Sequence, residues 1–403
     1  MIRQEIIAYV IDSQQAVFQK QELGLIRESL PNVPVADSFA TIITGLRRCG
    51  KSTLLVQLLN RDYKEAIYLN FDDIRLSGFN SEDFIRLHRE IENRAIKILF
   101  FDEIQIISGW EKFINQLLRE GYRIFITGSN ASLLSIELGT YLTGRHLSVE
   151  LFPFSYKEFI KYKEIEKGEE SLINYLKTGG IPEYVKTGVP FILNSLVDDI
   201  LIRDIAVRHS VRDIVSLRQL TAYLITNIGN PVSANKLVGI FGVKSATTFL
   251  EYFSYLKESY LFEFVPIFNH SLKIQARNPK KVYIMDLGFY TENSVSTSEN
   301  MGRRLENLIY LHLRRLYKQI FYYKERGECD FIVMEKNEVK AAIQVCLTLN
   351  DENFEREYKS LIEAMQNLNL KEGLIITLNQ KDHFENNDMV IKVIPAYEFL
   401  TSY

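Results

Sequence analysis

The stretch FATIITGLRRCGKSTLLVQLL, residues 39–59, decides how the first part of the chain folds. It begins as a short β-type run, passes through a turn bounded by glycines, and continues with apolar residues at helical spacing. Within it, residues 45–52 match the pattern G-x-x-x-x-G-K-[ST] at every defined position. The sequence therefore predicts a strand, a phosphate-binding loop and a helix, in that order.

A loop of this kind binds phosphate mainly through its backbone. Glycines let the chain wrap until N–H groups and the helix N-terminus face an anion, and the lysine adds a positive charge. We expect Lys51 to reach the phosphate oxygens and Ser52 to ligate Mg²⁺, while Cys49 has no chemical role. An ordinary glycine-rich turn is the alternative, and the flanking strand and helix disfavour it. The residues expected to line the phosphate are Gly45, Leu46, Arg47, Arg48, Cys49, Gly50, Lys51, Ser52 and Thr53.

A second signal follows about fifty residues later, where IKILFFDE, residues 96–103, has the pattern of an apolar strand that ends in two acids. In P-loop NTPases the first such acid orders Mg²⁺ and the second polarises the attacking water. A strand ending in Asp-Glu is a weak signal alone, because acids commonly close strands and cap the next helix. Together with the loop, it predicts that Asp102 orders the metal and that Glu103 is catalytic.

Two further runs complete a sheet. Residues 66–71 (AIYLNF) and 123–130 (RIFITGSN) each have the pattern of a strand, and the second ends in small polar residues. Because strands alternate with helices, we predict an α/β fold with a parallel sheet, whose ligands lie beyond the C-terminal strand ends. Ser129 and Asn130 should therefore lie on the nucleotide side of the sheet.

These blocks together resemble the bacterial and archaeal AAA-type P-loop ATPases that carry a C-terminal domain of unknown function. The resemblance spans nearly the whole chain and rests on GLRRCGKSTLL, FFDEIQ, FITGSNASLLS, TGRHLSVELFPFSYKEF and GGIPEY. It implies an ATPase with ATP and Mg²⁺ as cofactors, and Ser129 or Asn130 as a polar sensor of the γ-phosphate. It also implies that Arg145 is an arginine finger or sensor arginine, acting either in its own protomer or on a neighbour. A surface arginine after a turn is the alternative.

The middle of the chain is predicted to be helical at first. Residues 153–215 form a helical connector, broken where Gly179-Gly180 and Pro182 stop any helix. Residues 216–275 then give helix, turn, helix and strands, the order of a winged-helix domain. The start of its second helix, at Lys244, Thr247 and Thr248, could face a DNA groove. A winged helix that only bridges two domains is the alternative.

The last part of the chain, residues 276–403, is predicted to be α/β. A helix acid, a strand acid and a polar residue on the next strand occur as Glu306, Asp330 and Gln344. This is the arrangement of PD-(D/E)XK nucleases, which the C-terminal domain of the family resembles. In those enzymes two acids and the third polar side chain hold Mg²⁺ against a scissile phosphate, and a lysine stabilises the growing negative charge.

The lysine of that signature is missing, because Cys346 occupies its position two residues after Gln344. A thiol with a reference pKa near ~8.5 is mostly neutral at pH 7 and cannot supply the positive charge. Lys324 or Lys340 could compensate from neighbouring positions. We therefore expect a degenerate nuclease fold at Glu306, Asp330, Gln344 and Cys346, retained as a scaffold or for binding.

Composition limits the remaining possibilities. The net charge of −3 shows that the chain as a whole is not basic, so binding of nucleic acid would need a local basic surface. The three cysteines have neither metal-ligand nor disulfide spacing, and no apolar run is long enough to span a bilayer, so we expect a cytoplasmic chain.

We thus predict a P-loop ATPase domain at residues 1–152, ahead of the connector, winged-helix and nuclease-like domains. ATP hydrolysis would drive a conformational switch that acts on nucleic acid or on a protein partner. An ATP-gated nuclease and a non-catalytic, nucleotide-dependent DNA-binding regulator or scaffold are the alternatives. Oligomeric state and the biological process stay open.

Overall fold

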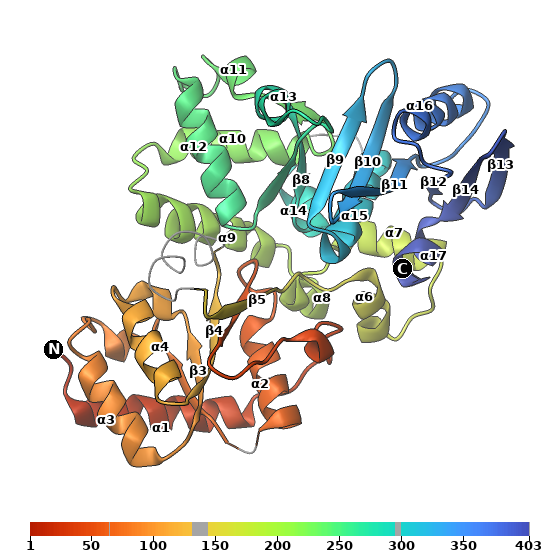
Figure 1. Ribbon diagram of the computed structural model, residues 1–403. Helices are drawn as coiled ribbons and strands as arrows, with labels where there is room; N and C mark the ends of the chain where they lie inside the picture. The colour runs from red at the N-terminus through yellow and green to blue at the C-terminus, as the bar shows by residue number, and fades with distance from the viewer. Residues whose placement is uncertain (64, 131–143, 295–299, 403) are drawn as a thin grey trace. The chain divides into compact units, whose positions relative to one another are not determined.

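The computed structural model describes residues 1–63, 65–130, 144–294 and 300–402 (Figure 1). The chain divides into two compact units. The first comprises Met1–Phe152 with Glu258–Tyr260, and the second comprises Pro153–Lys257 with Leu261–Tyr403.

The first unit contains a five-stranded parallel sheet in the order β2-β3-β4-β1-β5. The predicted α/β fold with a parallel sheet is confirmed. Strand β4 lies between β1 and β3, so the C-terminal ends of these strands are neighbours at one edge of the sheet. The elements are α1 (Gln4–Lys20), η1 (Leu30–Asn32), β1 (Ala40–Thr44), α2 (Lys51–Asp62), β2 (Ile67–Asn70), η2 (Ile74–Leu76), α3 (Phe84–Arg94), β3 (Ile98–Asp102), η3 (Ile104–Ile106), α4 (Trp110–Arg119), β4 (Arg123–Gly128) and β5 (His146–Glu150).

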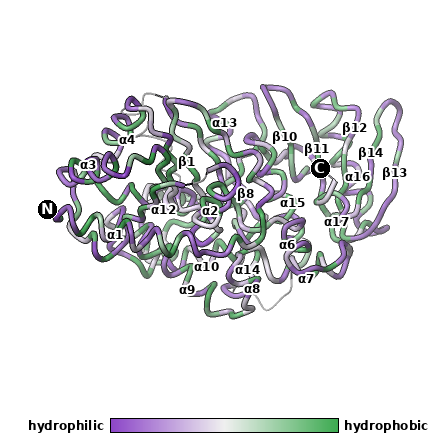
Figure 2. Tube along the Cα trace, turned by 90° about the horizontal axis from the view of Figure 1, so that it is seen from below, coloured by the Kyte–Doolittle hydropathy of each residue, from purple (hydrophilic) through white to green (hydrophobic). Residues whose placement is uncertain are grey.

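Helices cover both faces of this sheet, and its central strands are buried almost throughout. Every residue of β1 is buried, as in parallel sheets generally. On one face, side chains from α1, α3 and α4 form a single core with Leu99 and Phe101 of β3. Along α1 and α3, hydrophilic and hydrophobic residues alternate at helical spacing (Figure 2). Their apolar faces thus account for their position on the sheet.

Strand β2 forms the outer edge of the sheet, and side chains of α1 cover its backbone. Gln14 Oε1 accepts a hydrogen bond from the Asn70 N–H at 2.7 Å, and Gln15 Oε1 accepts one from the Tyr68 N–H at 2.9 Å. Gln14 Nε2 also donates to the Asn70 carbonyl at 3.1 Å. These glutamines thus satisfy backbone groups that a neighbouring strand would otherwise bind.

The second unit begins with helices and continues with two sheets. A three-stranded antiparallel sheet has the order β6-β8-β7, and a six-stranded mixed sheet has the order β13-β14-β12-β11-β10-β9. The helical part contains α6 (Tyr156–Lys163), α7 (Glu169–Thr178), α8 (Pro182–Thr187), α9 (Phe191–Asp199), the π-helix η5 (Ile200–Val207) and α10 (Ile214–Thr226). Next come β6 (Pro231–Val232), α11 (Ala234–Leu237), α12 (Ala246–Glu258), β7 (Phe262–Val265), α13 (Leu272–Arg277), β8 (Lys280–Ile284) and α14 (Leu287–Asn293). The last part contains α15 (Met301–Leu316), β9 (Gln319–Lys324), β10 (Glu328–Glu335), β11 (Glu338–Val345), α16 (Phe354–Asn367), β12 (Glu372–Thr377), β13 (Asp382–Asn386), β14 (Met389–Pro395) and α17 (Ala396–Ser402).

The Gly179-Gly180 turn separates α7 from α8, as its sequence predicts. Asp286, which follows β8, accepts hydrogen bonds from the Gly180 N–H at 2.7 Å and the Gly288 N–H at 2.9 Å. A Cβ on Gly180 would lie 2.3 Å from the Phe154 carbonyl oxygen. The glycine pair is therefore needed for close backbone approach, and it ties the helical part of the unit to the residues after β8.

Candidate functional site

The phosphate-binding loop joins β1 to α2. Strand β1 ends at Thr44 and α2 begins at Lys51. Gly45 (φ 141°) and Gly50 (φ 102°) both have positive φ values. A Cβ on Gly45 would lie 2.1 Å from the Leu151 carbonyl oxygen, so no side chain fits there. The loop therefore needs glycine at its first position to pack against the chain that follows β5.

The Lys51 side chain lies inside the loop and is buried. Its ammonium donates hydrogen bonds to the carbonyl oxygens of Gly45, at 3.1 Å, and Leu46, at 3.0 Å. Because Lys51 is the first residue of α2, its charge adds to the partial positive charge of that helix end. The local electrostatics are those of an anion-binding site.

The other residues of the loop differ in their exposure. Arg48 is exposed and adopts a left-handed backbone (φ 62°), Arg47 is half-buried, and Thr53 lies in the first turn of α2. Cys49 is buried, and burial raises the pKa of its thiol. Its Sγ donates to the Leu151 carbonyl at 3.2 Å, so Cys49 is a neutral packing residue beneath the loop.

An arginine that the sequence analysis missed supports the loop from below. Arg27 precedes β1, and its guanidinium donates to the carbonyl oxygens of Cys49, at 2.8 Å, and Phe152, at 2.7 Å. Only 4% of Arg27 is exposed. It thereby links the loop to the chain that follows β5. No motif marks this residue, because its partners are far away in the sequence.

Asp102, at the end of β3, is the centre of the polar network. Its Oδ2 accepts hydrogen bonds from Ser52 Oγ at 2.8 Å and from the Tyr68 hydroxyl at 2.9 Å. Its Oδ1 accepts one from Thr127 Oγ1. Burial, followed by the charge of Asp102, raises the pKa of Tyr68, so that hydroxyl stays a donor. The structure brings Ser52 and Asp102 together, and adds Tyr68 and Thr127, which the sequence analysis missed.

The oxygens of Ser52 and Asp102 fit a magnesium ion. Two ligands at right angles in an octahedral Mg²⁺ shell, each about 2.0–2.1 Å from the ion, lie about 2.8–3.0 Å apart. Ser52 Oγ and Asp102 Oδ2 are 2.8 Å apart. Both are oxygen donors, which Mg²⁺ prefers, and both lie at the edge of the sheet that holds the phosphate loop.

Glu103 follows Asp102 in a left-handed backbone conformation (φ 54°). Its N–H donates to the Thr127 carbonyl at 3.1 Å, which fixes the turn after β3 against β4. One oxygen of its carboxylate accepts a hydrogen bond from Gln105 Nε2. Gln105 therefore orients Glu103, a role that the sequence analysis did not assign.

Ser129 and Asn130 follow β4 at the same edge of the sheet, and both are buried. Within the described part of the chain, the Ser129 hydroxyl has no hydrogen-bond partner. A buried hydroxyl without a partner is unfavourable unless a ligand or water completes it. Because β4 lies between β1 and β3, these residues lie between the phosphate loop and Asp102.

Arg145 lies at the opposite edge of the sheet. Its carbonyl accepts from the N–H of Ala40, the first residue of β1, and the strand β5 that it precedes runs parallel to β1. The five residues of β1 separate this position from the phosphate loop, a span of roughly 16 Å at about 3.3 Å per residue. The Arg145 side chain is exposed and cannot bridge this distance. This position favours the neighbouring-protomer or surface-arginine alternatives over action within the same protomer, and the role of Arg145 stays a prediction.

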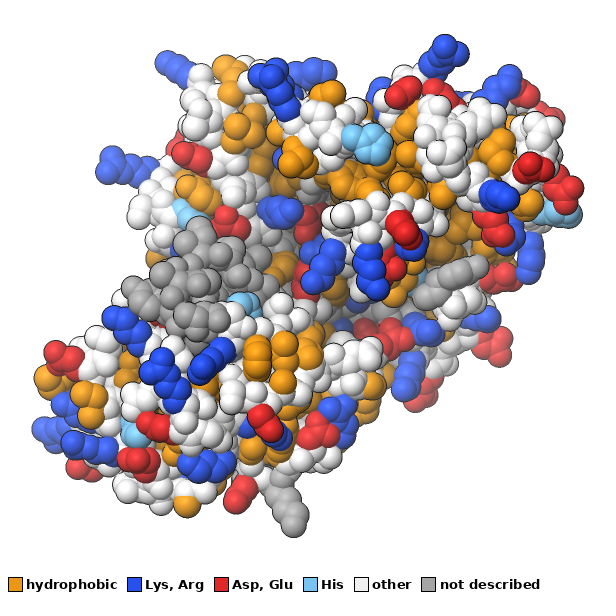
Figure 3. Space-filling model, viewed as in Figure 1, with side chains coloured by type: hydrophobic (Ala, Val, Ile, Leu, Met, Phe, Trp, Pro, Cys, Tyr) orange, Lys and Arg blue, Asp and Glu red, His pale blue; other side chains and the backbone are white. Residues whose placement is uncertain are grey.

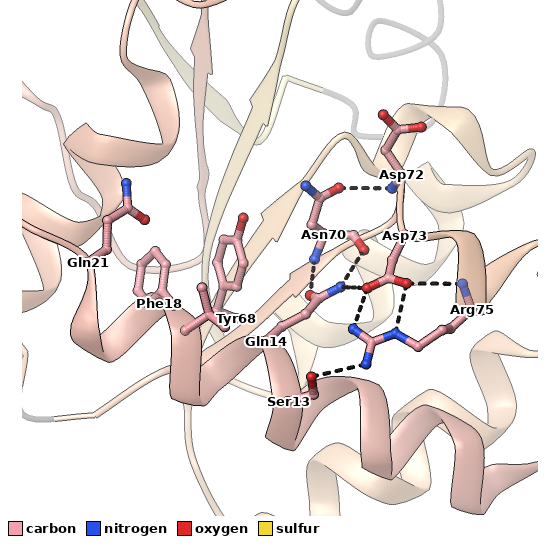
Figure 4. A pocket seen from close by; sticks show the side chains of 10 residues that line it. Ser13, Gln14, Phe18, Gln21, Tyr68, Asn70, Asp72, Asp73 and Arg75 are labelled. Atoms are coloured by element: carbon pink, nitrogen blue, oxygen red, sulfur yellow. Dashed lines mark hydrogen bonds and ion pairs between the residues drawn. The ribbon is translucent and has the colours of Figure 1, made fainter.

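A small pocket lies beside Tyr68 where α1 meets the end of β2 (Figure 4). It encloses about 290 Å³ and is lined by polar side chains that include Gln14, Asn70, Asp73 and Arg75. Asp73 accepts from Arg75 and from Gln14, and the Arg75 hydrogen bonds hold the pKa of Asp73 below its usual range. The polar groups that line this pocket are thus largely paired with one another.

In the second unit, Glu306 of α15 and Asp330 of β10 lie at one place, as expected for a nuclease-like domain. The ammonium of Lys281, in β8, donates to Glu306 Oε1 at 3.0 Å, Asp330 Oδ1 at 2.8 Å and Glu328 Oε1 at 3.0 Å. Tyr283, two residues further along β8, donates its hydroxyl to Glu306 Oε1 at 2.7 Å. Lys281, Tyr283 and Glu328 carry no recognisable motif and were missed by the sequence analysis.

The other two residues of the expected signature lie closer to α16. Gln344 Nε2 donates to a carboxylate oxygen of Glu357, and its Oε1 accepts from the Asp330 N–H at 3.2 Å. Cys346 follows the last residue of β11 and belongs to the apolar core of the domain. Burial and the charges of Glu357 and Asp330 raise its pKa to about 12, so Cys346 supplies no charge.

Neither of the lysines that could have compensated bonds to Glu306 or Asp330. Lys324 pairs with Glu328 Oε2 at 3.0 Å from an exposed position, and Lys340 pairs with Glu338 at 2.7 Å. The lysine among these carboxylates is Lys281.

A groove in the same unit is lined by basic side chains. It encloses about 670 Å³ between α11, α12, α13 and the two strands β7 and β8. Its lining includes Lys257, Arg277 and Lys280 and contains no acid. Burial, followed by the charge of Lys257, lowers the pKa of Lys280. In Figure 3, lysine and arginine side chains stand beside apolar ones over α11 and α13.

Among the described residues, no helix is both long and apolar enough to cross a membrane.

Two family models match the sequence. The family described as "AAA domain" matches residues 37–160, and "Domain of unknown function (DUF8612)" matches residues 169–298. Two solved structures share low similarity. The Aeropyrum pernix ORC1 protein in complex with DNA is 14% identical at a TM-score of 0.31, covering 69% of this chain and 95% of that one. The Pyrobaculum aerophilum Cdc6p structure is 13% identical at a TM-score of 0.29, covering 67% and 93%.

Two relatives match over most of their length. The uncharacterized protein MJ1544 of Methanocaldococcus jannaschii is 35% identical over 397 residues, which cover 90% of this chain and 88% of that protein. An uncharacterized protein of Haemophilus influenzae is 32% identical over 345 residues, covering 79% and 85%. With the AAA-domain match and the parallel sheet around the phosphate loop, these relatives place the chain in their family of P-loop proteins with an AAA domain.

Proposed function

We propose that the first unit binds ATP with Mg²⁺ and hydrolyses it. The observation that carries this proposal is the 2.8 Å contact between Ser52 and Asp102, beside a loop that encloses the Lys51 ammonium. These residues come from the start of α2 and the end of β3 and form a joint site for phosphate and metal. The AAA-domain family supports adenine over guanine as the base.

Each residue then has a separate role. Lys51 and the N–H groups of residues 45–52 bind the β- and γ-phosphates, and Ser52 and Asp102 would hold Mg²⁺, which neutralises charge on those phosphates. Glu103, oriented by Gln105, takes a proton from the attacking water. Ser129 and Asn130 detect the γ-phosphate, which supplies the partner that the Ser129 hydroxyl lacks among the described residues.

Phosphate release and binding of a fluorescent ATP analogue test this assignment. Lys51→Ala should lose binding, whereas Glu103→Gln should keep binding and lose turnover by about 10²- to 10⁴-fold, the usual contribution of a general base. Arg61→Ala removes a cation from the far end of the same helix and serves as the matched control. Turnover at the wild-type rate in Lys51→Ala would overturn the proposal.

For the second unit, we propose a nucleic-acid-binding role, on a winged-helix domain at residues 216–275. The support is the order α10, β6, α11, α12 and β7, which follows the helix, turn, helix and strands of that domain. Strand β8, just beyond the domain, completes an antiparallel sheet with β6 and β7. Lys244 and Thr247, at the start of α12, are exposed and so accessible to a DNA groove. The helical connector precedes this domain at residues 153–215, and the nuclease-like domain at residues 276–403 follows it.

The basic groove provides a more specific reason for an anionic partner. Arg277 and Lys280 have no hydrogen-bonded or ion-paired partner among the described residues, and Lys257 pairs with Glu263 at 3.1 Å. Lys280 is half-buried beside Lys257. This position is unfavourable for a charged lysine, because burial and the like charge of Lys257 both disfavour the protonated form of Lys280. A phosphate in the groove would relieve both effects. We therefore propose that the groove binds the phosphate backbone of a nucleic acid.

Fluorescence anisotropy with labelled DNA and RNA strands, at several salt concentrations, tests this role. Arg277→Ala and Lys280→Ala should each weaken binding and reduce the salt slope by about 1, as expected for one lost phosphate contact. Lys273→Ala, an exposed lysine of α13 outside the groove, is the control. If all variants bind the labelled strands with equal affinity, the groove is not the nucleic-acid-binding site. If binding is absent or independent of salt, a protein partner is favoured.

Two alternatives are less well supported. An ATP-gated nuclease would need a cation-stabilised transition state at Glu306 and Asp330, but Lys281 already bonds to both acids. A non-catalytic regulator or scaffold would show ATP turnover at background together with nucleotide-dependent affinity for DNA. The three free cysteines and an ATP site are consistent with work in the cytoplasm, where thiols stay reduced.

A further inference from the structure

The carboxylate cluster of the second unit already surrounds a cation. The ammonium of Lys281 has three N–H donors, and each has a separate carboxylate oxygen at 2.8 to 3.0 Å, from Glu306, Glu328 and Asp330. The hydrogen-bonding capacity of the ammonium is therefore filled. This three-to-one arrangement differs from an ordinary surface pair, in which one lysine meets one acid.

The second oxygens of the two main acids have close neighbours. Asp330 Oδ2 accepts from the Val345 N–H at 2.9 Å. Glu306 Oε2 lies under Gly229, where an added Cβ would be only 3.1 Å away. A metal bound to Asp330 would thus share an oxygen that already accepts a hydrogen bond, from Lys281 or from Val345.

A divalent ion does not fit beside the ammonium. Mg²⁺ requires oxygens at about 2.0–2.1 Å, so at the shared oxygens it would lie next to a buried positive charge. Consistent with this, no group of three or more His, Cys, Asp or Glu side chains in the described ranges is arranged to hold a metal ion. The residues present therefore do not fit the metal that a nuclease fold implies.

Lys281 is held in its charged form. Only 2% of its side chain is exposed, and burial alone would lower its pKa. The charges of Asp330, Glu306 and Glu328 outweigh burial and raise the pKa of Lys281 well above its ordinary value. The cation therefore stays in place over the whole physiological pH range.

Strand β8 contributes side chains both to the carboxylate cluster and to the basic groove. Successive side chains of a strand point to opposite faces, so Lys281 and Tyr283 share one face of β8 while Lys280 points to the other. Both Lys281 and Tyr283 bond to Glu306, whereas Lys280 lines the basic groove. The cluster thus joins the three-stranded sheet to α15 and β10.

We propose that Lys281 is the resident cation of the Glu306, Glu328 and Asp330 cluster, and that this cluster binds no divalent metal while Lys281 is in place. The carboxylates of a nuclease-like site here hold β8 against α15 and β10 instead of cutting a phosphodiester. The proposal deepens the proposed degeneracy of this domain, on which it rests, and is independent of ATP hydrolysis in the first unit.

Electron paramagnetic resonance of Mn²⁺ tests the proposal on the full-length chain without nucleotide. Lys281→Ala should bind one more Mn²⁺ per chain than the wild type, and adding Asp330→Asn should remove that ion. Lys324→Ala is the matched control, because Lys324 also pairs with Glu328 but is 55% exposed, and it should gain no site. A Mn²⁺ site in the wild type that Asp330→Asn removes would overturn the proposal.

If Lys281→Ala folds too poorly for the Mn²⁺ measurement, the melting temperatures of other variants test the same proposal. Lys281→Met leaves three carboxylates without their ammonium, so its melting temperature should fall by roughly 10 °C, and Asp330→Asn in the same chain should restore part of the loss. A Lys281→Met variant as stable as Lys324→Met would contradict the proposal. If the wild type cleaves DNA with a metal and Asp330→Asn abolishes the cleavage, both this inference and the proposed loss of nuclease activity are wrong. If the wild type binds Mn²⁺ at this cluster without cleaving DNA, only this inference is wrong.

Discussion

The hydroxyl of Tyr68 donates to Asp102 Oδ2 across 2.9 Å, from β2 to the neighbouring strand β3. Ser52 donates to the same oxygen at 2.8 Å, and Thr127 donates to the other. Three hydroxyls from three elements therefore orient one carboxylate before any ligand arrives. Such preorganisation is valuable at a metal site, because the ligand pays no further ordering entropy.

Tyr68→Phe should weaken the use of Mg²⁺ without abolishing catalysis. The variant removes one of the hydrogen bonds that fix Asp102, and a bond to a charged group contributes about 1.5–3 kcal/mol. We expect the Mg²⁺ concentration for half-maximal ATP turnover to rise about tenfold, with activity recovered at saturating Mg²⁺. Tyr63→Phe, an aromatic residue packed against Phe100 and Phe125, is the control. Identical Mg²⁺ activation curves for Tyr68→Phe and the wild type would contradict the role of Tyr68.

Arg145 should act on a neighbouring protomer if it acts at the phosphate at all. Arg145→Ala and Glu103→Gln should each be inactive alone, but a mixture should recover turnover. In that mixture, an intact site in one protomer receives the arginine of the other. Glu103→Gln mixed with Lys51→Ala is the control and should stay inactive, because both changes damage the same site. A mixture of Arg145→Ala and Glu103→Gln without recovery would return Arg145 to the role of a surface residue.

Arg27→Met should destabilise the first unit and weaken nucleotide binding together. The change leaves the buried carbonyls of Cys49 and Phe152 without their charged donor, which we expect to lower the free energy of unfolding by about 3 kcal/mol. Urea unfolding and titration with the fluorescent ATP analogue measure the two effects. Arg61→Ala again provides the comparison. Normal stability in Arg27→Met would show that the loop does not need this support.

Cys346 should make stability fall on the alkaline side. Its pKa rises from 9.0 to about 12, because burial and the charges of Glu357 and Asp330 disfavour the thiolate. An acid whose pKa is higher in the folded state contributes fully below its unfolded pKa and loses that contribution as pH rises. Relative to Cys346→Ala, the wild type should therefore lose up to about 1.4 kcal/mol per pH unit above pH 9. Urea unfolding at pH 8 to 10.5 measures this, and a pH-independent difference would refute it.

The parts of the site that follow a strand end could be predicted from the sequence. The phosphate loop, Asp102 and Ser129 are each marked by a local pattern of apolar residues followed by small or acidic ones. Parallel strands bring such ends to one edge, so the pattern also predicts their proximity. Tyr68 and Arg27 could not be found in this way, because their hydrogen bonds cross between segments that no local rule connects.

Lys281 is a further residue whose role in the structure no local sequence pattern could predict. The sequence offers two candidates for a compensating lysine, Lys324 on the preceding strand and Lys340 just before the strand that leads to Cys346. The lysine that meets Asp330 is 49 residues away, in a different sheet of the same unit. Only the packing of β8 against α15 and β10 places it there, and packing of that kind depends on many side chains at once.

Strand β2 closes one route by which copies of the chain could associate. The N–H groups of Tyr68 and Asn70 are already bound to glutamine side chains of α1, so a strand from another molecule finds no free donors at those positions. Growth of a continuous intermolecular sheet, as in fibrils, is therefore hindered at this edge. If protomers must meet for Arg145 to act, strand pairing at β2 is therefore not the contact that brings them together.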